Sequence, residues 1–481
     1  MEPNKQRTPG SFYVLISVFF FWGFVAASNT ILIPLFKKHF DLSQAQSQLV
    51  DSAFYVAYGV GSLVYFLWSV LAGDPLNKIG YKKGLIIGLL MSAMGTLVFV
   101  PAAGQNSFPM MLLALFLVAF GFALQQIVAN PYVIALGSPE TGAHRNTLAG
   151  AINSFGTTIG PLLVGYAIFG GINNSNTNVG LETVKTPYLI LGIAFVAFAC
   201  LLGFSKLPPI RNEEKASFSF GVFKYPQLIL GMIAIFIYVG VEVSIQSNLP
   251  ELMRQADFLG LEADKTVHYI SLYWGCLMIG RWTGAINAFG LKQSTKNLLT
   301  FVLPLVAYAV IILVNYIKCA PIENIKDSPI YDLLCFGPFI LVLVVGSYIV
   351  KEKPAQTMLI FGTLAAVMMI IGLMTIGKFA VYSFISGGLF CSVMWPCIFA
   401  LSIAGLGKYT PQGSSLLIMM ILGGAVIPVA QGKLSEYIGI HYSYIIPVIC
   451  FSYLAFFGWK VKQVLKRQGI DYETTSSGGG H

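Results

Sequence analysis

The chain has 481 residues, of which 56% are hydrophobic and only 10% are charged, and its mean hydropathy is +0.74. Soluble globular domains carry about 25% charged residues, so these values exclude a soluble protein. Apolar stretches of about 18 residues or more, the length that a helix needs to cross a bilayer, recur along the whole chain. The formal net charge is +9. Because the lysines and arginines fall mainly in alternate loops, they indicate membrane orientation rather than nucleic-acid binding.

The sequence therefore predicts an all-α polytopic membrane protein. Its fourteen apolar segments cover about 11–36, 45–72, 84–102, 109–136, 146–170, 187–206, 227–250, 268–289, 297–316, 332–351, 357–376, 379–404, 412–433 and 440–460. The first is interpreted as a retained helix, because no small-residue cleavage site precedes its polar end. An even number of spans places both termini on one side. The loops of that side hold most of the basic residues, which predicts cytoplasmic termini in a bacterial inner membrane.

Three weak internal matches indicate that the chain consists of two related halves. "VAASNTILIP" at 25–34 aligns with "VEVSIQSNLP" at an offset of 216 residues, whereas "ANPYVIAL" at 129–136 and "GTTIGPLLVG" at 156–165 align with later segments at offsets of 265 and 267. The offset grows by about 50 residues, enough for two further spans. We expect two six-helix bundles plus an extra helical pair within about 291–356. The domain organisation is then 1–206, a cytoplasmic linker at 207–225, 226–465, and a tail at 466–481 whose last residues, "SSGGGH", resemble an added tag.

Several amide side chains lie inside these apolar segments. Gln126 and Asn130 are four residues apart and share one helix face, as do Asn153 and Thr157. Amides and hydroxyls that face a cavity are suited to a hydroxylated solute such as a sugar. The alternative is that they join helices by hydrogen bonds. Gln125 points to another face and is assigned to helix joining, and Asn130, beside Pro131, is as well explained by capping of freed backbone groups.

Two carboxylates lie at membrane depth, Asp51 and Glu242. A charge in the bilayer is a functional hypothesis by default, so both are candidates for ion coupling with H⁺ or Na⁺, and Glu242 also for sugar binding. Asp51 lies close enough to a segment end that solvation alone explains it equally well. Gln246 follows Glu242 by one turn on the same face.

Aromatic rings can stack on the apolar face of a sugar. Trp395, which precedes Pro396, and Tyr273, beside Trp274, are candidates for this role, and the alternative is ordinary packing within the bundle or against lipid.

The loop "GDPLNKIGYKKG" at 73–84 resembles the major facilitator superfamily pattern G-x-x-x-D-[RK]-x-G-[RK]-[RK]. Asn77 stands at the position of the acid, and the basic pair is shifted to Lys82 and Lys83. The resemblance implies two bundles that rock about a central site, and a gating loop that contains Gly73, Lys78 and Gly80. The two glycines would permit a tight turn.

Further motifs resemble the L-fucose:proton symporter family, which includes bacterial glucose/galactose carriers. They are spread over both halves: "NTILIPLF", "SAFYVAYG", "ANPYVIALG", "NSFGTTIGP", "YVGVE", "IGRWTGA" and "QGSSLLIMMILGGAVIPVAQG". Thr30 and Gln126 occupy positions where the family has its proton-carrying acids, whereas the sugar-binding asparagine is kept as Asn153. The resemblance therefore implies a sugar site but leaves the coupling route open.

We thus expect a hexose carrier that works by alternating access, with its site between the two bundles. Symport with Na⁺ or H⁺ is favoured because Glu242 remains, and a passive uniporter or a sugar sensor without flux are the alternatives. The sequence does not rank glucose, galactose and fucose. It contains no P-loop, no His-rich ligand cluster and no nucleophile–base pair, so neither an enzyme nor a cofactor is expected. The expected partners are a monosaccharide and the lipid bilayer, and the protein is expected to be a monomer.

Overall fold

The computed structural model describes residues 11–42, 49–137, 141–169, 180–208, 220–261, 266–289, 291–318, 329–350 and 353–470. All regular structure within these ranges is helical, as the sequence predicts. Eleven of the described helical segments are long and apolar enough to cross a membrane. Most of the predicted linker, 209–219, and the tail beyond 470 lie outside the described residues.

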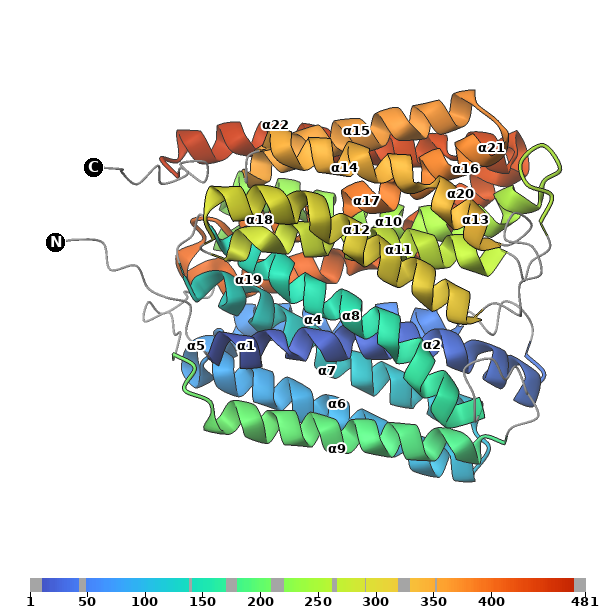
Figure 1. Cartoon of the computed structure of the whole chain (residues 1–481). Helices are drawn as coiled ribbons and strands as arrows, with labels where there is room; N and C mark the ends of the chain where they lie inside the picture. The colour runs from blue at the N-terminus through green and yellow to red at the C-terminus, as the bar shows by residue number, and fades with distance from the viewer. Residues whose placement is uncertain are drawn as a thin grey trace. The chain divides into compact units, whose positions relative to one another are not determined.

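The helices of the first half are drawn from blue to green in Figure 1. They are α1 (Ser11–Ile16), α2 (Val18–His39), α4 (Leu49–Ala72), α5 (Pro75–Ile79), α6 (Tyr81–Gly104), α7 (Phe108–Ala135), α8 (Gly142–Phe169) and α9 (Glu182–Phe204).

The second half contains more helices, several of them short. They are α10 (Pro226–Arg254), α11 (Val267–Ala285), α12 (Gln293–Lys318), α13 (Pro329–Cys335), α14 (Gly337–Val350), α15 (Pro354–Met374), α16 (Gly377–Ile385), α17 (Gly387–Cys391), α18 (Met394–Ile403), α19 (Thr410–Met419), α20 (Gly423–Ile438), α21 (Ile440–Ser443) and α22 (Ile445–Arg467). Short 3₁₀ turns occur at Gly221–Lys224, Ile286–Ala288, Gly407–Tyr409 and Met420–Leu422.

The chain divides into two compact units. Unit 1 consists of Met1–Gly142, Ile152–Tyr225 and Gly405–Leu422, and unit 2 consists of Ala143–Ala151, Pro226–Ala404 and Gly423–His481. Each unit therefore receives one short segment from the other half of the sequence. In unit 1 the received helix, α19, packs against α4 and α7.

Small residues allow close helix packing inside unit 1. Helix α6 lies along both α7 and α9 (Figure 1). A Cβ atom added to Gly95 of α6 would lie 2.5 Å from the backbone nitrogen of Val118 in α7, so no larger residue fits there. In a membrane, where apolar surfaces gain little by leaving lipid, such close backbone approach supplies much of the attraction between helices.

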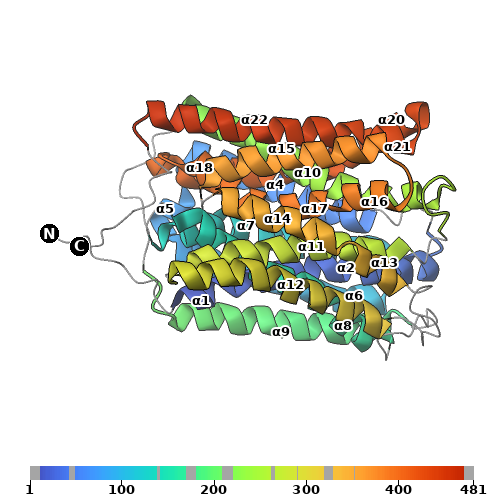
Figure 2. The same ribbon diagram turned by 45° about the horizontal axis from the view of Figure 1, so that its top comes forward.

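In unit 2, glycines likewise allow close packing between α15 and α22, which lie side by side in Figures 1 and 2. A Cβ atom on Gly362 would lie 2.7 Å from the Ala455 nitrogen, and one on Gly458 would lie 2.6 Å from the Leu359 nitrogen. Two glycines on two facing helices thus fix the same contact.

Helices α12 and α13–α14 fall inside the range 291–356, where the sequence predicts an additional helical pair. Only 17% of the most apolar window of α12 is buried within the protein, the lowest value among the candidate spans of the described chain. This helix packs chiefly on α11, while α14 contacts α12 and α15. The apolar and largely exposed surface of α12 suits contact with lipid.

The loop after α4 forms two sharp turns around α5. Gly73 and Gly80 adopt φ values of +81° and +83°, in the left-handed region that glycine tolerates. Asp74 caps α5 by accepting hydrogen bonds from the Leu76 backbone N–H at 2.9 Å and the Tyr65 hydroxyl at 2.6 Å. Burial raises the pKa of the Asp74 carboxyl, although these hydrogen bonds act in the opposite direction. The buried acid of this loop is thus Asp74, three residues before the position at which the superfamily pattern has one.

Lys78 and Lys82 of this loop differ in their environment. Lys78 is exposed. The Lys82 ammonium donates to the carbonyl oxygens of Gly203 at 2.9 Å and Ser205 at 2.8 Å, at the C-terminal end of α9. A cation at this end of a helix satisfies terminal carbonyls and interacts favourably with the helix dipole.

Replacing Asp74 tests its role in this turn. Asp74→Ala removes the cap and leaves the buried Tyr65 hydroxyl without its acceptor, so we expect the free energy of unfolding to fall by about 2 kcal/mol. Asp74→Asn keeps an oxygen at this position and is expected to lose less than half as much. Melting temperatures of the purified variants in one detergent provide the measurement, and equal losses for Ala and Asn would contradict the capping role.

Candidate functional site: buried amides and one ion pair

The amide of Gln125 joins three helices of unit 1. Its oxygen accepts a hydrogen bond from the indole N–H of Trp22 in α2 at 3.0 Å, and its nitrogen donates to the Ser92 hydroxyl in α6 at 2.9 Å. The side chain is fully buried. The assignment of Gln125 to helix joining is therefore confirmed.

Gln126 lies on a different face of α7 and is only half-buried. Its nitrogen donates to the Tyr58 hydroxyl of α4 at 2.9 Å. One turn later, the Asn130 nitrogen donates to the backbone carbonyl of Gln126 at 2.9 Å, and the Asn130 residue is 1% exposed. The two amides that share a face thus differ in environment, because Gln126 retains accessible surface whereas Asn130 is enclosed.

Pro131 interrupts the hydrogen-bond pattern of α7. Proline lacks a backbone N–H, so the carbonyl four residues earlier, that of Ile127, has no helical donor. The Ser414 hydroxyl of α19 donates to this carbonyl at 2.7 Å. A side chain from the second half of the sequence therefore satisfies the backbone of α7.

Asn153 lies on α8 where this helix meets α2. It is half-buried, and its nitrogen donates to the backbone carbonyl of Phe19 at 3.0 Å. A Cβ atom on Gly23 would lie 2.1 Å from the Asn153 carbonyl oxygen, so the two helices are in backbone contact. Thr157, one turn further, donates to the Ser154 carbonyl of its own helix.

Thr30 and Asp51 lie in α2 and α4, respectively. Their side chains lie outside the described part of the structure. Their roles therefore stay predictions.

Unit 2 contains an ion pair inside its helices. The Glu242 carboxylate of α10 and the Arg281 guanidinium of α11 are 3.5 Å apart, and their side chains are 11% and 14% exposed. Arg281 also donates through Nε to the Ser392 carbonyl at 3.3 Å, and the Tyr273 hydroxyl donates to the Glu242 backbone carbonyl at 2.8 Å. The carboxylate is thus held beside a cation that is itself anchored to the backbone.

The remaining candidates of this half lie on α10, α11 and α18. Gln246 is half-buried one turn after Glu242, and Trp395 is half-buried with its ring centroid 6.1 Å from that of Tyr238. Tyr273 is fully buried, and its neighbour Trp274 is 39% exposed. Tyr273 therefore contacts the backbone of α10 and positions it.

Arg281 is the residue that sequence reasoning missed. It stands in "GRWTGA", inside an apolar segment. A cation at such a position is as unusual as a carboxylate. Searching the apolar segments for charges of both signs would have paired Arg281 with Glu242.

The ion pair predicts a characteristic pattern of stability. Glu242→Gln or Arg281→Gln alone leaves one buried charge without its partner, and we expect each to cost about 3 kcal/mol. The double variant removes both charges and is expected to melt above either single variant. Thermal unfolding of the four proteins measures the coupling, and a double variant that is as unstable as the sum of the singles would show that the residues act independently.

The fold and the sequence identify the class of protein. The family model of the Major Facilitator Superfamily matches residues 14–350. The structure is similar to the crystal structure of the Escherichia coli fucose:proton symporter, with a TM-score of 0.70 and 23% identity over 94% of this chain and 98% of that chain. The chain belongs to the Major Facilitator Superfamily and is a membrane transporter, not an enzyme.

Full-length relatives narrow this class. The glucose/galactose transporter of Brucella abortus biovar 1 (strain 9-941) is 34% identical over 461 residues, which cover 95% of each protein. The L-fucose-proton symporter of Escherichia coli (strain K12) is 25% identical over 470 residues, covering 93% of this chain and 92% of that protein. Within the superfamily, the chain belongs to the family of these sugar transporters.

Proposed function

We propose that this protein transports a hexose of the glucose, galactose or fucose type across the bacterial inner membrane by alternating access. The names of the relatives support a monosaccharide as the cargo. The observation that carries the proposal is the accessible amide of Gln126, oriented by Tyr58, together with the half-buried amide of Asn153. Amides both donate and accept hydrogen bonds, as sugar hydroxyls require.

The proposed architecture has fourteen spans, with six in the domain 1–206 and eight in the domain 226–465, joined by the linker 207–225. Helices α12 and α13–α14 form the additional pair of the second domain. The excess of lysine and arginine in alternate loops supports cytoplasmic termini. The loop with Gly73, Lys78 and Gly80 then belongs to the cytoplasmic side and acts in gating, and the protein works as a monomer.

The proposed sugar site draws on both halves of the sequence. Its polar groups are uncharged except for Glu242, and two aromatic rings complete it. The members are Gln126, Asn153, Asn130, Thr30, Glu242, Gln246, Trp395 and Tyr273. The contacts of Asn130 and Tyr273 favour positioning roles, because both side chains are enclosed and bonded to backbone carbonyls.

Coupling to an ion is assigned to Glu242, with Asp51 as the second candidate. Glu242 is paired with the Arg281 guanidinium, and binding of H⁺ or Na⁺ to the carboxylate requires that this pair separate. The named proton symporters among the relatives favour H⁺. A uniporter is the second candidate function, supported by the uncharged Thr30 and Gln126 at the positions of the family acids.

Reconstitution into liposomes tests transport and coupling together. We expect labelled hexose to accumulate when an inward proton or sodium gradient is imposed, because the ion supplies the driving force. Glu242→Gln is expected to abolish accumulation, because the proposed coupling carboxylate is removed. Equilibrium exchange within about twofold of the unmodified protein would show that only coupling was lost, and not sugar binding.

The proton and sodium gradients also distinguish a symporter from a uniporter and from a sensor. Equal uptake with and without either gradient would establish a uniporter, and saturable binding without flux would establish a sensor. Unchanged accumulation by Glu242→Gln would refute its coupling role without affecting the sugar assignment.

Substitutions of the amides test the sugar site. Gln126→Leu or Asn153→Leu leaves sugar hydroxyls without partners, so we expect hexose affinity to fall by about tenfold or more. Gln356→Leu, on α15 and outside the proposed site, makes the same chemical change and serves as the control. Tryptophan fluorescence or calorimetric titration of folded protein measures the affinity, and unchanged affinity in both variants would remove the basis of the site.

A further inference from the structure

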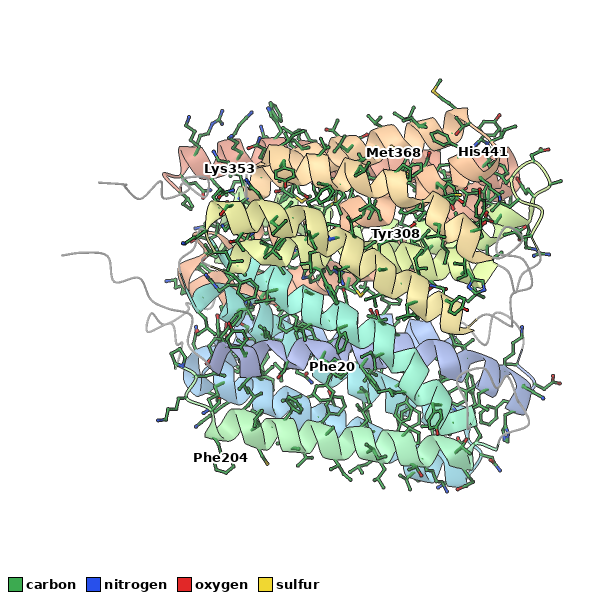
Figure 3. The ribbon with its side chains drawn as sticks, in the orientation of Figure 1. Phe20, Phe204, Tyr308, Lys353, Met368 and His441 are labelled. Carbon is green, nitrogen blue, oxygen red and sulfur yellow. The ribbon has the colours of Figure 1, made fainter. Side chains whose placement is uncertain are left out.

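Unit 2 contains a cavity of about 400 Å³, a size typical of small-molecule sites. Its walls come from α11, α12, α14, α15 and α18 and from the first turns of α8. Val350 and Thr357 line it on either side of Lys353, which lies at one end of this unit, opposite His441 (Figure 3). None of the residues proposed for the sugar site lines this cavity.

The polar lining favours a ligand with negative charge. It includes one lysine, Lys296, one histidine, His144, and three amides, Asn287, Gln293 and Asn297. The described lining residues include no aspartate or glutamate. A phosphate accepts hydrogen bonds from such donors and gains further from the lysine charge.

Three hydroxyl groups of the cavity wall already donate hydrogen bonds within their own helices. Thr283, Thr300 and Ser347 each donate to a backbone carbonyl of their own helix at 2.7–2.8 Å. Their oxygens can still accept, which suits the hydroxyls of a polyol. The wall therefore offers donors at its cationic and amide positions and acceptors along its hydroxyl positions.

Hydrogen bonds and close packing join neighbouring parts of the cavity wall. The Tyr348 hydroxyl of α14 donates to the Asn297 backbone carbonyl of α12 at 2.6 Å, and the Gln293 amide donates to the Asn297 side-chain oxygen at 3.0 Å. A Cβ atom on Gly284 would lie 2.7 Å from a Val393 methyl group and 3.0 Å from that of Thr147. Glycine at this position therefore lets α11 pack closely against Val393 and Thr147 at the wall of the cavity.

We propose that this cavity is a second ligand site, which binds a phosphate ester that also bears hydroxyls. Lys296 is the principal anchor, and the amides of α12 complete the contact. Two sources share this chemistry: a soluble sugar phosphate, the product of phosphoryl transfer to a hexose, and the headgroup of an anionic phospholipid. The site lies at the end of unit 2 at which Lys353 is found (Figure 3).

The test uses the full chain in nanodiscs of phosphatidylcholine, with glucose 6-phosphate and inorganic phosphate as probes. We expect a saturable rise in melting temperature with glucose 6-phosphate and a weaker one with phosphate. Lys296→Gln is expected to weaken the apparent affinity by about tenfold or more, because a charge-assisted contact is lost. Lys292→Gln removes the same charge from an exposed neighbour and is expected to keep the affinity.

A parallel series in nanodiscs that contain phosphatidylglycerol distinguishes the two sources. Stabilisation by this lipid alone, lost in Lys296→Gln but kept in Lys292→Gln, would identify the headgroup as the ligand. The proposal is overturned if neither the two soluble probes nor phosphatidylglycerol stabilises the protein, or if both lysine variants weaken binding equally, which would indicate general charge attraction. Hexose exchange by Lys296→Gln in phosphate-free buffer is expected to be unchanged; its loss would assign the cavity to the transport path and leave the hexose proposal intact.

Discussion

A polar group inside hydrocarbon must find its hydrogen-bond partner within the protein, and this requirement governs how the described helices of the chain meet. In unit 1, Gln125 connects α2, α6 and α7 through Trp22 and Ser92. In unit 2, Gln431 of α20 accepts from Ser244 of α10 and donates to Ser443 of α21. Each amide fixes the rotation of its helix, because a turned helix would leave the amide unsatisfied in an apolar surrounding. Glycines then let the backbones approach closely enough for these bonds to form.

Pro131 of α7 creates a backbone carbonyl that needs a hydrogen-bond donor, and this donor comes from a residue distant in sequence. The Ile127 carbonyl that Pro131 leaves without a donor is satisfied by Ser414, 287 residues later. Helix α19 therefore belongs to unit 1 by contact, although it follows the helices of unit 2 in sequence. Its continuation, α20, belongs to unit 2, and a 3₁₀ turn at Met420–Leu422 separates the two. One predicted span is thus shared between both units, and its helix is interrupted where the chain passes from one unit to the other.

The sequence predicted the helical class and most segment positions, because apolar length and spacing are local properties. It also separated Gln125 from Gln126 correctly, since a helix places neighbouring residues on different faces. It could not predict the partner of Glu242, the capping by Ser414 or the burial of Asp74. Each of these depends on a contact between helices that are distant in sequence, and a motif position such as Asn77 gave no sign that the acid had moved to Asp74.

The charges within the apolar helices bear on how transport could be coupled to an ion. A lone carboxylate at membrane depth is costly unless it is protonated, whereas a carboxylate beside a guanidinium can remain ionised. With Thr30 and Gln126 uncharged, the first half has no acid at the family positions, and the Glu242–Arg281 pair supplies an acid in the second half. For the coupling proposed above, Arg281 compensates Glu242, so that a cation competes with the guanidinium for the carboxylate. A rearrangement of α10 against α11 that lengthens the 3.5 Å contact would favour the cation. In the proposed mechanism, the separation of these two helices therefore links ion binding to the conformational change.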